Sequence, residues 1–436
     1  MKNYPGYLRN MLNSVIRDMA KHPEVFCRNP GKDFTRSRKL PFEKVLSLLL
    51  KMGGHSLRDE MLDHLGSKDL PASVSALVQQ RSKILPEAAE YLFRRFTQLS
   101  ENPQLYKGYR LMAVDGTDLQ FTANPNDPLS YFPGTQNQMH YSFLHLNALY
   151  DLNSHCYLDA VVQKRRAANE NAALIQMVDR LETKHPAIII ADRGYEAYNI
   201  LDHIMQRNWF YLIRVRDSRS IISPLVLPEG EFDLPIQIYL TRSQTKRTKQ
   251  LQKDHPGIYR FLPSTVTLDS LPFACKKLYP LSFRVVRFCT SDTNTVTLIT
   301  NLDANTFPTD ELKHLYHLRW GIETSFRHLK YTVGLSLFQS KKVEYITQEI
   351  FARLTVYNFC ELITSHVVTQ KKRRKYVYQT NFTAAVHICR QFLRGSVSPP
   401  DVEALIKMQM VPIRPGRSTP RKTKSIKFNG FFYRIA

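Results

Sequence analysis

Hydrophobic positions in the first quarter of the chain follow a helical period. The segment 41–52, "PFEKVLSLLLKM", places apolar residues at 42, 45, 46, 49 and 50, which is one face of a helix. The segment 73–99 continues this period, and Pro86 is expected to begin a new helix because proline is tolerated in a first helical turn. Residues 1–105 are therefore predicted to form a helical domain.

From 106 the apolar residues form short runs typical of strands. "YRLMAVDGTDLQF" is expected to be a buried strand ended by a turn at Asp115-Gly116-Thr117, and 140–163 to be a β-hairpin with the turn "DLNS". An amphipathic helix, the strand "PAIIIA" ending at Asp192, a further helix and the strand "WFYLIRV" come next. Strands followed by alternating helices and strands predict an α/β domain with a mixed sheet over 106–215.

Residues 216–304 interrupt this alternation. They contain proline-rich turns, the basic patch "RSQTKRTKQLQK" and a hairpin candidate, so a β-rich insertion is expected. Pro308 and Thr309 then provide helix-start chemistry, with Asp310 and Glu311 in the first turn, where acids favour the helix dipole. The α/β domain is expected to resume over 305–370, and 371–436 is expected to be a basic C-terminal region for DNA contact or dimerisation.

Charge gives the first indication of a partner. The 436 residues include 61 lysines and arginines against 38 acids, a net charge of +23. Fifteen of the basic residues and only two acids fall in 371–436. Such an excess indicates a polyanion, nucleic acid before membrane. The basic residues of 1–105 leave two readings open, a plain helical bundle or a bundle that docks on DNA.

Other compositional features exclude several classes of protein. The sequence has no apolar run of membrane-spanning length and its first residues have no signal-peptide core, so no membrane span and a cytoplasmic location are expected. The six cysteines form no CxxC pair, which argues against a zinc site or a disulfide framework.

Two aspartates mark the ends of buried strands. Asp115 and Asp192 each follow an apolar run, and ligands of α/β sheets gather beyond the carboxyl ends of strands. If the strands are neighbours, both carboxylates point at one place and repel each other unless a divalent cation is present. Oxygen ligands select Mg²⁺ or Mn²⁺. The plain alternative is that each aspartate is a turn residue.

A third acid lies on the predicted helix at 310–330. At about 100° per residue, Tyr316, Arg319, Glu323 and Lys330 fall on one side of that helix, at the border of its apolar face. Glu323 would complete an acidic metal site, and the other three would supply donors to phosphate oxygens. The alternative is that Arg319 and Glu323 form an ordinary i,i+4 ion pair.

These motifs resemble those of the DDE transposases of bacterial insertion sequences. The spacing of Tyr316, Arg319, Glu323 and Lys330 matches the Y-R-E-K signature of one group of that family. "DRGYEAY" at 192–198 matches its second motif, and Asp115 lies in the strand–"DGT" context of its first acid. The resemblance covers roughly 106–340.

The resemblance implies an RNase H-like catalytic domain interrupted by a β-rich insertion. Asp115, Asp192 and Glu323 would be the catalytic residues and would bind two Mg²⁺ ions, for which Mn²⁺ can substitute, about 3.5–4 Å apart. The partners would be double-stranded DNA, namely the terminal inverted repeats and the target, held by a homodimer. Predicted DNA contacts besides the catalytic acids are Tyr316, Arg319, Trp320, Lys330, Arg193, Lys246, Arg247 and Lys249.

The resemblance departs from the family pattern in one respect. Members that cut through a DNA hairpin stack a flipped base on aromatics, prominently a tryptophan of the insertion, but Trp209 and Trp320 both lie outside 216–304. Tyr239, Tyr259 or Phe273 are substitutes. Two other functions stay open: an inactive or domesticated transposase that only binds DNA, and an RNase H-fold nuclease or resolvase.

Overall fold

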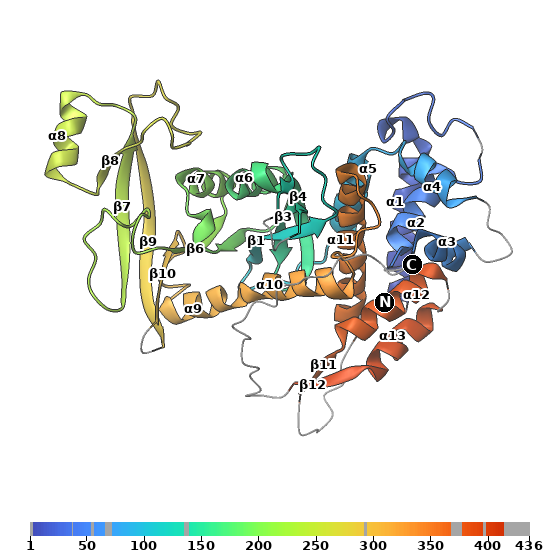
Figure 1. Ribbon diagram of the computed structural model, residues 1–436. Helices are drawn as coiled ribbons and strands as arrows, with labels where there is room; N and C mark the ends of the chain where they lie inside the picture. The colour runs from blue at the N-terminus through green and yellow to red at the C-terminus, as the bar shows by residue number, and fades with distance from the viewer. Residues whose placement is uncertain are drawn as a thin grey trace.

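A twisted sheet runs through the middle of the protein and positions everything else (Figure 1). The computed structural model describes residues 3–413 except 37, 54–55, 66–71, 135–138, 292–293, 368–376 and 396–397. In these residues the sheet has ten strands in the order β2-β3-β1-β5-β6-β10-β9-β7-β8, with β4 also pairing with β3. The strands are β1 Arg110–Phe121, β2 Tyr131–Phe132, β3 Tyr141–Asp151, β4 Cys156–Lys164, β5 Ala187–Ala191, β6 Phe210–Val215, β7 Phe232–Thr241, β8 Tyr259–Phe261, β9 Leu278–Ser291 and β10 Asn294–Thr300.

Five of these strands form the predicted RNase H-like core. β4, β3 and β1 pair antiparallel, and β1, β5 and β6 pair parallel, which gives the spatial order β4-β3-β1-β5-β6. Each of these strands lies where the apolar runs predict it. The mixed α/β fold class is therefore confirmed.

Helices cover both faces of this core. On one face lie α6 (Glu170–Arg180) and α7 (Tyr198–Gln206), and on the other lie α9 (Thr309–Leu318), α10 (Trp320–Arg327) and α11 (Val343–His366) (Figure 1). Alternate side chains of β1 and β5 enter separate clusters. Ala113 and Ile190 pack in the cluster that contains Ile322 of α10, whereas Val114 lies in the opposite one.

The β-rich insertion continues the sheet and is not a separate layer. β10 pairs antiparallel with β6, and β9 and β7 extend the sheet outward from it. The hairpin predicted from the sequence is the β9–β10 pair. A short helix, α8 (Lys246–Asp254), lies at the far end of the insertion, opposite the N-terminal helices (Figure 1).

The N-terminal helices pack around α11 together with two C-terminal helices, α12 (Phe382–Arg394) and α13 (Pro399–Met408). Arg81 and Glu349 form a buried ion pair at 3.1 Å that joins α4 to α11. Pro86 begins α5, as predicted. The N-terminal helices are α1 Tyr4–Lys21, α2 Phe42–Lys51, α3 Leu57–Leu65, α4 Val74–Arg81 and α5 Pro86–Leu99.

The described part of the basic C-terminal region has regular structure. Residues 377–395 and 398–413 contain β11 (Val377–Thr380), α12, α13 and β12 (Met410–Ile413), and apolar side chains such as Phe392 are buried against α11. The basic runs 371–375 and 414–427 lie outside the described residues. Among the described helices, none combines the length and apolar character needed to cross a membrane.

Candidate active site

Asp115 lies within β1 and not in a turn after it. The strand continues through 115–117 to Phe121, and Asp115 pairs with Ala148 of β3. The predicted turn was wrong because β3 offers an antiparallel partner along the whole of this stretch. The parallel pairing with β5, in contrast, ends at Ala113 and Ile190. Asp115 therefore lies where β1 loses its neighbour on one side.

Asp192 follows β5 directly and shares its face with Asp115. Ala113 and Ile190 form the last parallel pair, and each aspartate lies two residues further along its own strand. Asp192 keeps an extended backbone, with φ −85° and ψ 173°. Side chains of extended chains alternate between faces, so both aspartates face the side on which Ala113 and Ile190 meet α10.

The helix that carries the third acid is irregular. α9 ends at Leu318 and α10 begins at Trp320, and the backbone N–H of Arg319 bonds to the carbonyl of Tyr316, three residues back. Residues 328–332 are π-helical. The expectation of one regular helix over 310–330 was therefore wrong. Tightening at Arg319 and widening at 328–332 change the angle per residue, and π segments are frequent at functional sites.

Two side chains of this helix nevertheless bond to residues at the carboxyl ends of β1 and β5, and two others form the i,i+4 ion pair that the sequence left open as an alternative. Tyr316 Oη donates to Asp192 Oδ1 at 3.2 Å, and Arg319 Nη2 donates to Glu323 Oε1 at 2.9 Å. Lys330 Nζ donates to the backbone oxygen of Asp118 on β1 at 3.0 Å. The structure thus gathers Tyr316, Arg319, Glu323 and Lys330 at the edge that carries both aspartates.

Arg319 is the most enclosed of these polar residues. It is 5% exposed, and its Nε has no hydrogen-bond partner among the described residues. Its guanidinium lies 5.1 Å from the ring of Trp320, which is 44% exposed. A buried donor without an acceptor is costly, so this position favours an incoming oxygen ligand.

Charge accumulates around Asp115. Burial, with a smaller contribution from the negative charges of Glu323 and Glu170, raises the pKa of Asp115 to about 6 against the opposing effects of the Gly116 N–H and Arg319. A carboxyl group in such surroundings is unfavourable as an anion unless a cation approaches it. The electrostatics at this edge are therefore suited to a positively charged ligand.

The three acids do not form a compact ligand set with the side chains as they lie. No group of three or more His, Cys, Asp or Glu side chains in the described ranges is placed to hold a metal ion. Glu323 is engaged by Arg319, and Asp192 is engaged by Tyr316, with Arg214 4.0 Å away. Three carboxylates on one face of the sheet are suitable ligands for a hard divalent cation. To bind it together, Asp192 and Glu323 must give up their present bonds to Tyr316 and Arg319.

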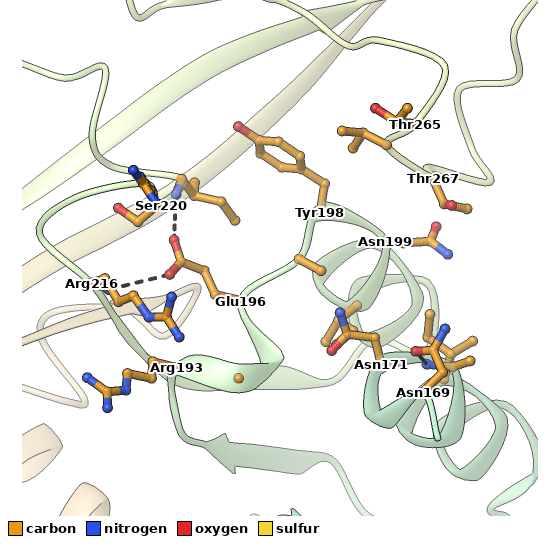
Figure 2. Close-up of a pocket in the computed structure, with 18 residues that line it drawn as sticks. Asn169, Asn171, Arg193, Glu196, Tyr198, Asn199, Arg216, Ser220, Thr265 and Thr267 are labelled. Carbon is orange, nitrogen blue, oxygen red and sulfur yellow. Dashed lines mark hydrogen bonds between the residues drawn. The ribbon is translucent and has the colours of Figure 1, made fainter. Parts of the chain in front are cut away.

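Arg193, the residue after Asp192, lines a cavity on the other face of the sheet. This cavity of about 690 Å³ lies between α6, α7 and the insertion, and Arg216 and Arg219 also line it (Figure 2). Glu196 is held there by the backbone N–H groups of Arg216 and Ile221 (Figure 2). The cavity is cationic and contains none of the three acids.

The remaining predicted DNA contacts are remote from the acids. Lys246, Arg247 and Lys249 are exposed on α8, at the outer end of the insertion (Figure 1). Of the three aromatic candidates, Tyr239 and Tyr259 stack on each other with ring centroids 5.0 Å apart. Phe273 is 65% exposed, with the Arg242 guanidinium 4.7 Å from its ring.

Sequence reasoning missed a second set of polar residues beside the acids. His145 of β3 is buried between Asp118 of β1 and Glu170 of α6. These residues lie 27 and 25 positions apart in the chain, so no local spacing connects them. The only available signal was Asp118 itself, a second acid on the strand of Asp115.

The strand order and the acidic edge define the protein as RNase H-like. The family model for the transposase DDE domain matches residues 106–359. The chain belongs to this family, whose members are metal-dependent enzymes that cleave DNA and transfer strands. The protein is therefore a DDE transposase of the insertion-sequence type.

Two bacterial transposases are similar to this chain. The transposase InsG for insertion sequence element IS4 of Escherichia coli strain K12 is 26% identical over 374 residues, 80% of this chain and 76% of the relative. The transposase for element IS231B of Bacillus thuringiensis subsp. berliner is 23% identical over 62% of this chain and 59% of the relative. The piggyBac transposase in a synaptic complex with hairpin DNA is 10% identical, with a TM-score of 0.48 over 95% of this chain and 87% of that one.

Proposed function

We propose that the protein moves an insertion sequence by cut-and-paste transposition, with Asp115, Asp192 and Glu323 as its catalytic acids. One observation carries the assignment. The two aspartates lie two residues beyond the last parallel pair of β1 and β5, on the face against which α10 presents Glu323. Three acids on separate elements converge on an edge where ligands of such sheets bind.

The three carboxylates would hold Mg²⁺, with Mn²⁺ as a substitute. When bound, two such ions activate water or a DNA 3′-OH and stabilise the leaving oxygen. The raised pKa of Asp115, caused first by burial, supports a site that is completed by cation binding. Glu323 must leave Arg319 to join the two aspartates.

DNA phosphates would be the groups that release the acids. Tyr316, Arg319 and Lys330 now bond to Asp192, Glu323 and the backbone of Asp118. A phosphate near the edge offers these donors another anionic acceptor, and the metal offers the acids a divalent cation in place of their present partners. Binding of DNA and of metal would therefore be linked. DNA takes the basic and hydroxyl donors away from the acids, and metal takes the acids away from those donors.

Further DNA contacts would extend in two directions from this edge. Arg193, Arg216 and Arg219 make the cavity of Figure 2 a cationic surface directly beside Asp192. Trp320, exposed beside Arg319, is suited to stack on a base. Lys246, Arg247 and Lys249 on α8 would contact DNA far from the acids.

A cationic cavity favours DNA docking by the N-terminal helical region. Lys32, Arg36, Arg38 and Lys83 line a cavity of about 300 Å³. Within the ranges described, none of the four forms an ion pair, and the nearby Asp33 accepts from both N–H groups of Asn29. Unpaired cations around a hollow are typical of a phosphate site.

The molecule would then be organised as a helical DNA-binding region over 1–105, a catalytic core over 106–215 and 305–370, an insertion over 216–304 and a basic region over 371–436. Double-stranded terminal repeats and target DNA would be held by a homodimer in the bacterial cytoplasm. The strong net positive charge supports a DNA partner.

The test is excision from a supercoiled plasmid that carries the element's own ends. Wild-type protein with Mg²⁺ should release the flanked segment, and Asp115→Asn, Asp192→Asn and Glu323→Gln should each lower the rate by at least about 10³-fold while still binding the ends. Asp18→Asn, at an exposed acid of α1, is the matched control. Excision that survives in any of the three variants contradicts the assignment.

Other outcomes point to the two remaining functions. End binding without cleavage in Mg²⁺ or Mn²⁺ indicates an inactive descendant. Cutting of branched DNA without preference for the ends indicates a nuclease or resolvase.

A further inference from the structure

His145 is an almost completely buried histidine held between two carboxylates. It lies on β3 directly opposite Asp118 of β1 and is 3% exposed. Its Nδ1 is 2.6 Å from Asp118 Oδ1, and its Nε2 is 3.1 Å from Glu170 Oε1. The Nδ1 contact with Asp118 is a hydrogen bond, whereas Nε2 lies at ion-pair distance from Glu170 without hydrogen-bond geometry. A ring with a proton on both nitrogens is positively charged and attracts both carboxylates.

The His145 ring lies against the residue that follows Asp115. A Cβ added to Gly116 would come 2.4 Å from His145 Nε2, well inside contact distance. Gly116 has no positive φ, so its backbone alone does not require glycine. The ring occupies the space that a side chain at 116 would need, and it thereby supports β1 at the point where Asp115 leaves the pairing with β5.

Glu170 connects the same histidine to the loop that follows Asp192. It begins α6, where a carboxylate favours the helix dipole. Its Oε2 would be 3.6 Å from a Cβ placed on Gly194, two residues after Asp192. Glu170 is also one of the charges that act on Asp115. The chain of contacts from Asp118 through His145 to Glu170 therefore spans both aspartate-bearing segments.

We propose that His145 is a positioning residue for the transposition chemistry, which holds Asp118 and Glu170 and keeps the Glu170 carboxylate from acting as a fourth ligand at the metal site. The proposal rests on the proposed function, since it takes Asp115 and Asp192 as metal ligands. In the absence of His145, Glu170 would be an unpaired carboxylate close to Asp115. It would then attract the metal away from the arrangement that Asp115, Asp192 and Glu323 require.

His203 provides a matched control in the same molecule. Its Nδ1 is 2.8 Å from Asp179 Oδ1 and its Nε2 is 2.9 Å from Asp269 Oδ2, so it also bridges two carboxylates. It lies on α7 and contacts none of the three acids through these bonds. The substitutions His145→Gln and His203→Gln therefore each remove a histidine that lies between two carboxylates, one beside the candidate active site and one away from it.

The first measurement is the cleavage rate at the element's ends as a function of Mg²⁺ concentration. His145→Gln should lower the rate at saturating Mg²⁺ about tenfold or more without raising the half-saturating concentration, because the metal binds but is misplaced. The double variant H145Q/E170Q should recover to within about threefold of wild type, because the competing carboxylate is gone. His203→Gln should stay within about twofold of wild type in rate, whatever its loss of melting temperature.

A purely structural role predicts a different result. Equal losses of rate and melting temperature in His145→Gln and His203→Gln, or no recovery in the double variant, would overturn the proposal. If His145→Gln does not fold at the assay temperature, the smaller neutral variant His145→Asn takes its place.

A second measurement does not depend on transposition. Calorimetric titration of the full chain with Mn²⁺ alone should show tighter binding by His145→Gln than by wild type, by about threefold or more, and wild-type affinity in H145Q/E170Q. Unchanged Mn²⁺ affinity in His145→Gln refutes the shielding of Glu170. A wild type that does not cut the ends contradicts the proposed function, whereas the Mn²⁺ comparison still decides the role of His145.

Discussion

The strands and the helix at the candidate active site position their polar groups by different means. Asp115 and Asp192 are placed by backbone pairing, which fixes where each strand ends and which face each side chain takes. Glu323 and Arg319 lie on an irregular helix and are held by bonding to each other. Strand pairing therefore fixes the positions of the two aspartates without help from a ligand. Arg319 and Glu323, in contrast, are bonded to each other, and a ligand that binds either of them must replace that bond.

This difference leaves two of the three acids with side-chain partners inside the protein. Arg319 forms an ion pair with Glu323, and Tyr316 donates to Asp192. Asp115 accepts from the Gly116 N–H and, among the described residues, from no side chain, and burial raises its pKa to about 6. We therefore expect substitutions that disturb sheet packing to impair cleavage through Asp115 and Asp192. Substitutions that change charge should impair cleavage through Arg319 and Glu323.

Among changes that leave the three acids in place, loss of the helix cation should have the largest effect. Arg319→Gln removes both the partner of Glu323 and a buried donor for phosphate, so the cleavage rate should fall by about 10²-fold or more. Arg319→Lys should recover little, because lysine lacks the planar fork. Arg327→Gln, at an exposed arginine of α10, is the control. A variant Arg319→Gln that cuts at the wild-type rate contradicts the role given to the helix.

A change in the strand should act through packing. Gly116→Ala drives a methyl group into His145 and should cost about 1–3 kcal/mol of unfolding free energy, with a loss of cleavage of about tenfold. Chemical denaturation and single-turnover cleavage measure the two effects. Gly31→Ala, at a glycine whose added Cβ meets nothing within 4 Å but whose φ is +74°, measures for comparison the cost of backbone strain without a clash. Wild-type stability in Gly116→Ala would show that the strand end is not held by the ring.

The His145 contacts should also make stability depend on pH. Burial alone would lower the pKa of His145, but its interactions with Asp118 and Glu170 outweigh burial and raise the pKa to about 9. A raised pKa means that the stabilisation is complete below about pH 6.5 and is lost as pH rises through about 9. The measured quantity is the difference in unfolding free energy between wild type and His145→Gln. This difference should fall by about 1–2 kcal/mol between pH 6 and 9.5. The expected fall is smaller than the full pKa shift implies, because both acids are partly exposed to solvent. A constant difference would contradict a charged His145.

The smallest effect should come from the cationic cavity of the N-terminal region, which is remote from both strands and helix. The double variant R36Q/R38Q should reduce the slope of log affinity for the ends against log salt by about 1.8 if both arginines contact phosphates. R17Q/K21Q, with the same loss of charge on α1, should leave the slope unchanged. Equal slopes in the two variants would remove this cavity from the DNA-binding surface.

Strands and most helices of this fold could be predicted because their apolar runs are long and regular. The Asp115-Gly116-Thr117 segment could not, because an Asp-Gly pair is a turn signal and its pairing with β3 is decided by residues 141–151. Likewise the helix at 310–330 was projected with a constant angle per residue, which the tight turn at Arg319 and the π-helical 328–332 do not keep.

The signature residues of the candidate site could be found from spacing alone, but their present partners could not. The spacing gives no indication that Lys330 bonds to the backbone of Asp118 or Tyr316 to Asp192. The bridge through His145 joins three elements that come together only in the folded sheet. Contacts between distant segments leave no periodic pattern in a single sequence.

The central claim is that Asp115, Asp192 and Glu323 share one metal site, and metal-directed cleavage of the polypeptide tests it most directly. Fe²⁺ placed at a Mg²⁺ site reduces added hydrogen peroxide to hydroxide and a hydroxyl radical, ascorbate returns the Fe³⁺ to Fe²⁺, and the radicals cut the chain beside the metal's ligands. With end DNA bound, we predict fragments that end within a few residues of 115, 192 and 323, suppressed together by excess Mg²⁺ and by Asp192→Asn. Cuts at other positions, or cuts that persist unchanged in Asp192→Asn, would contradict the account.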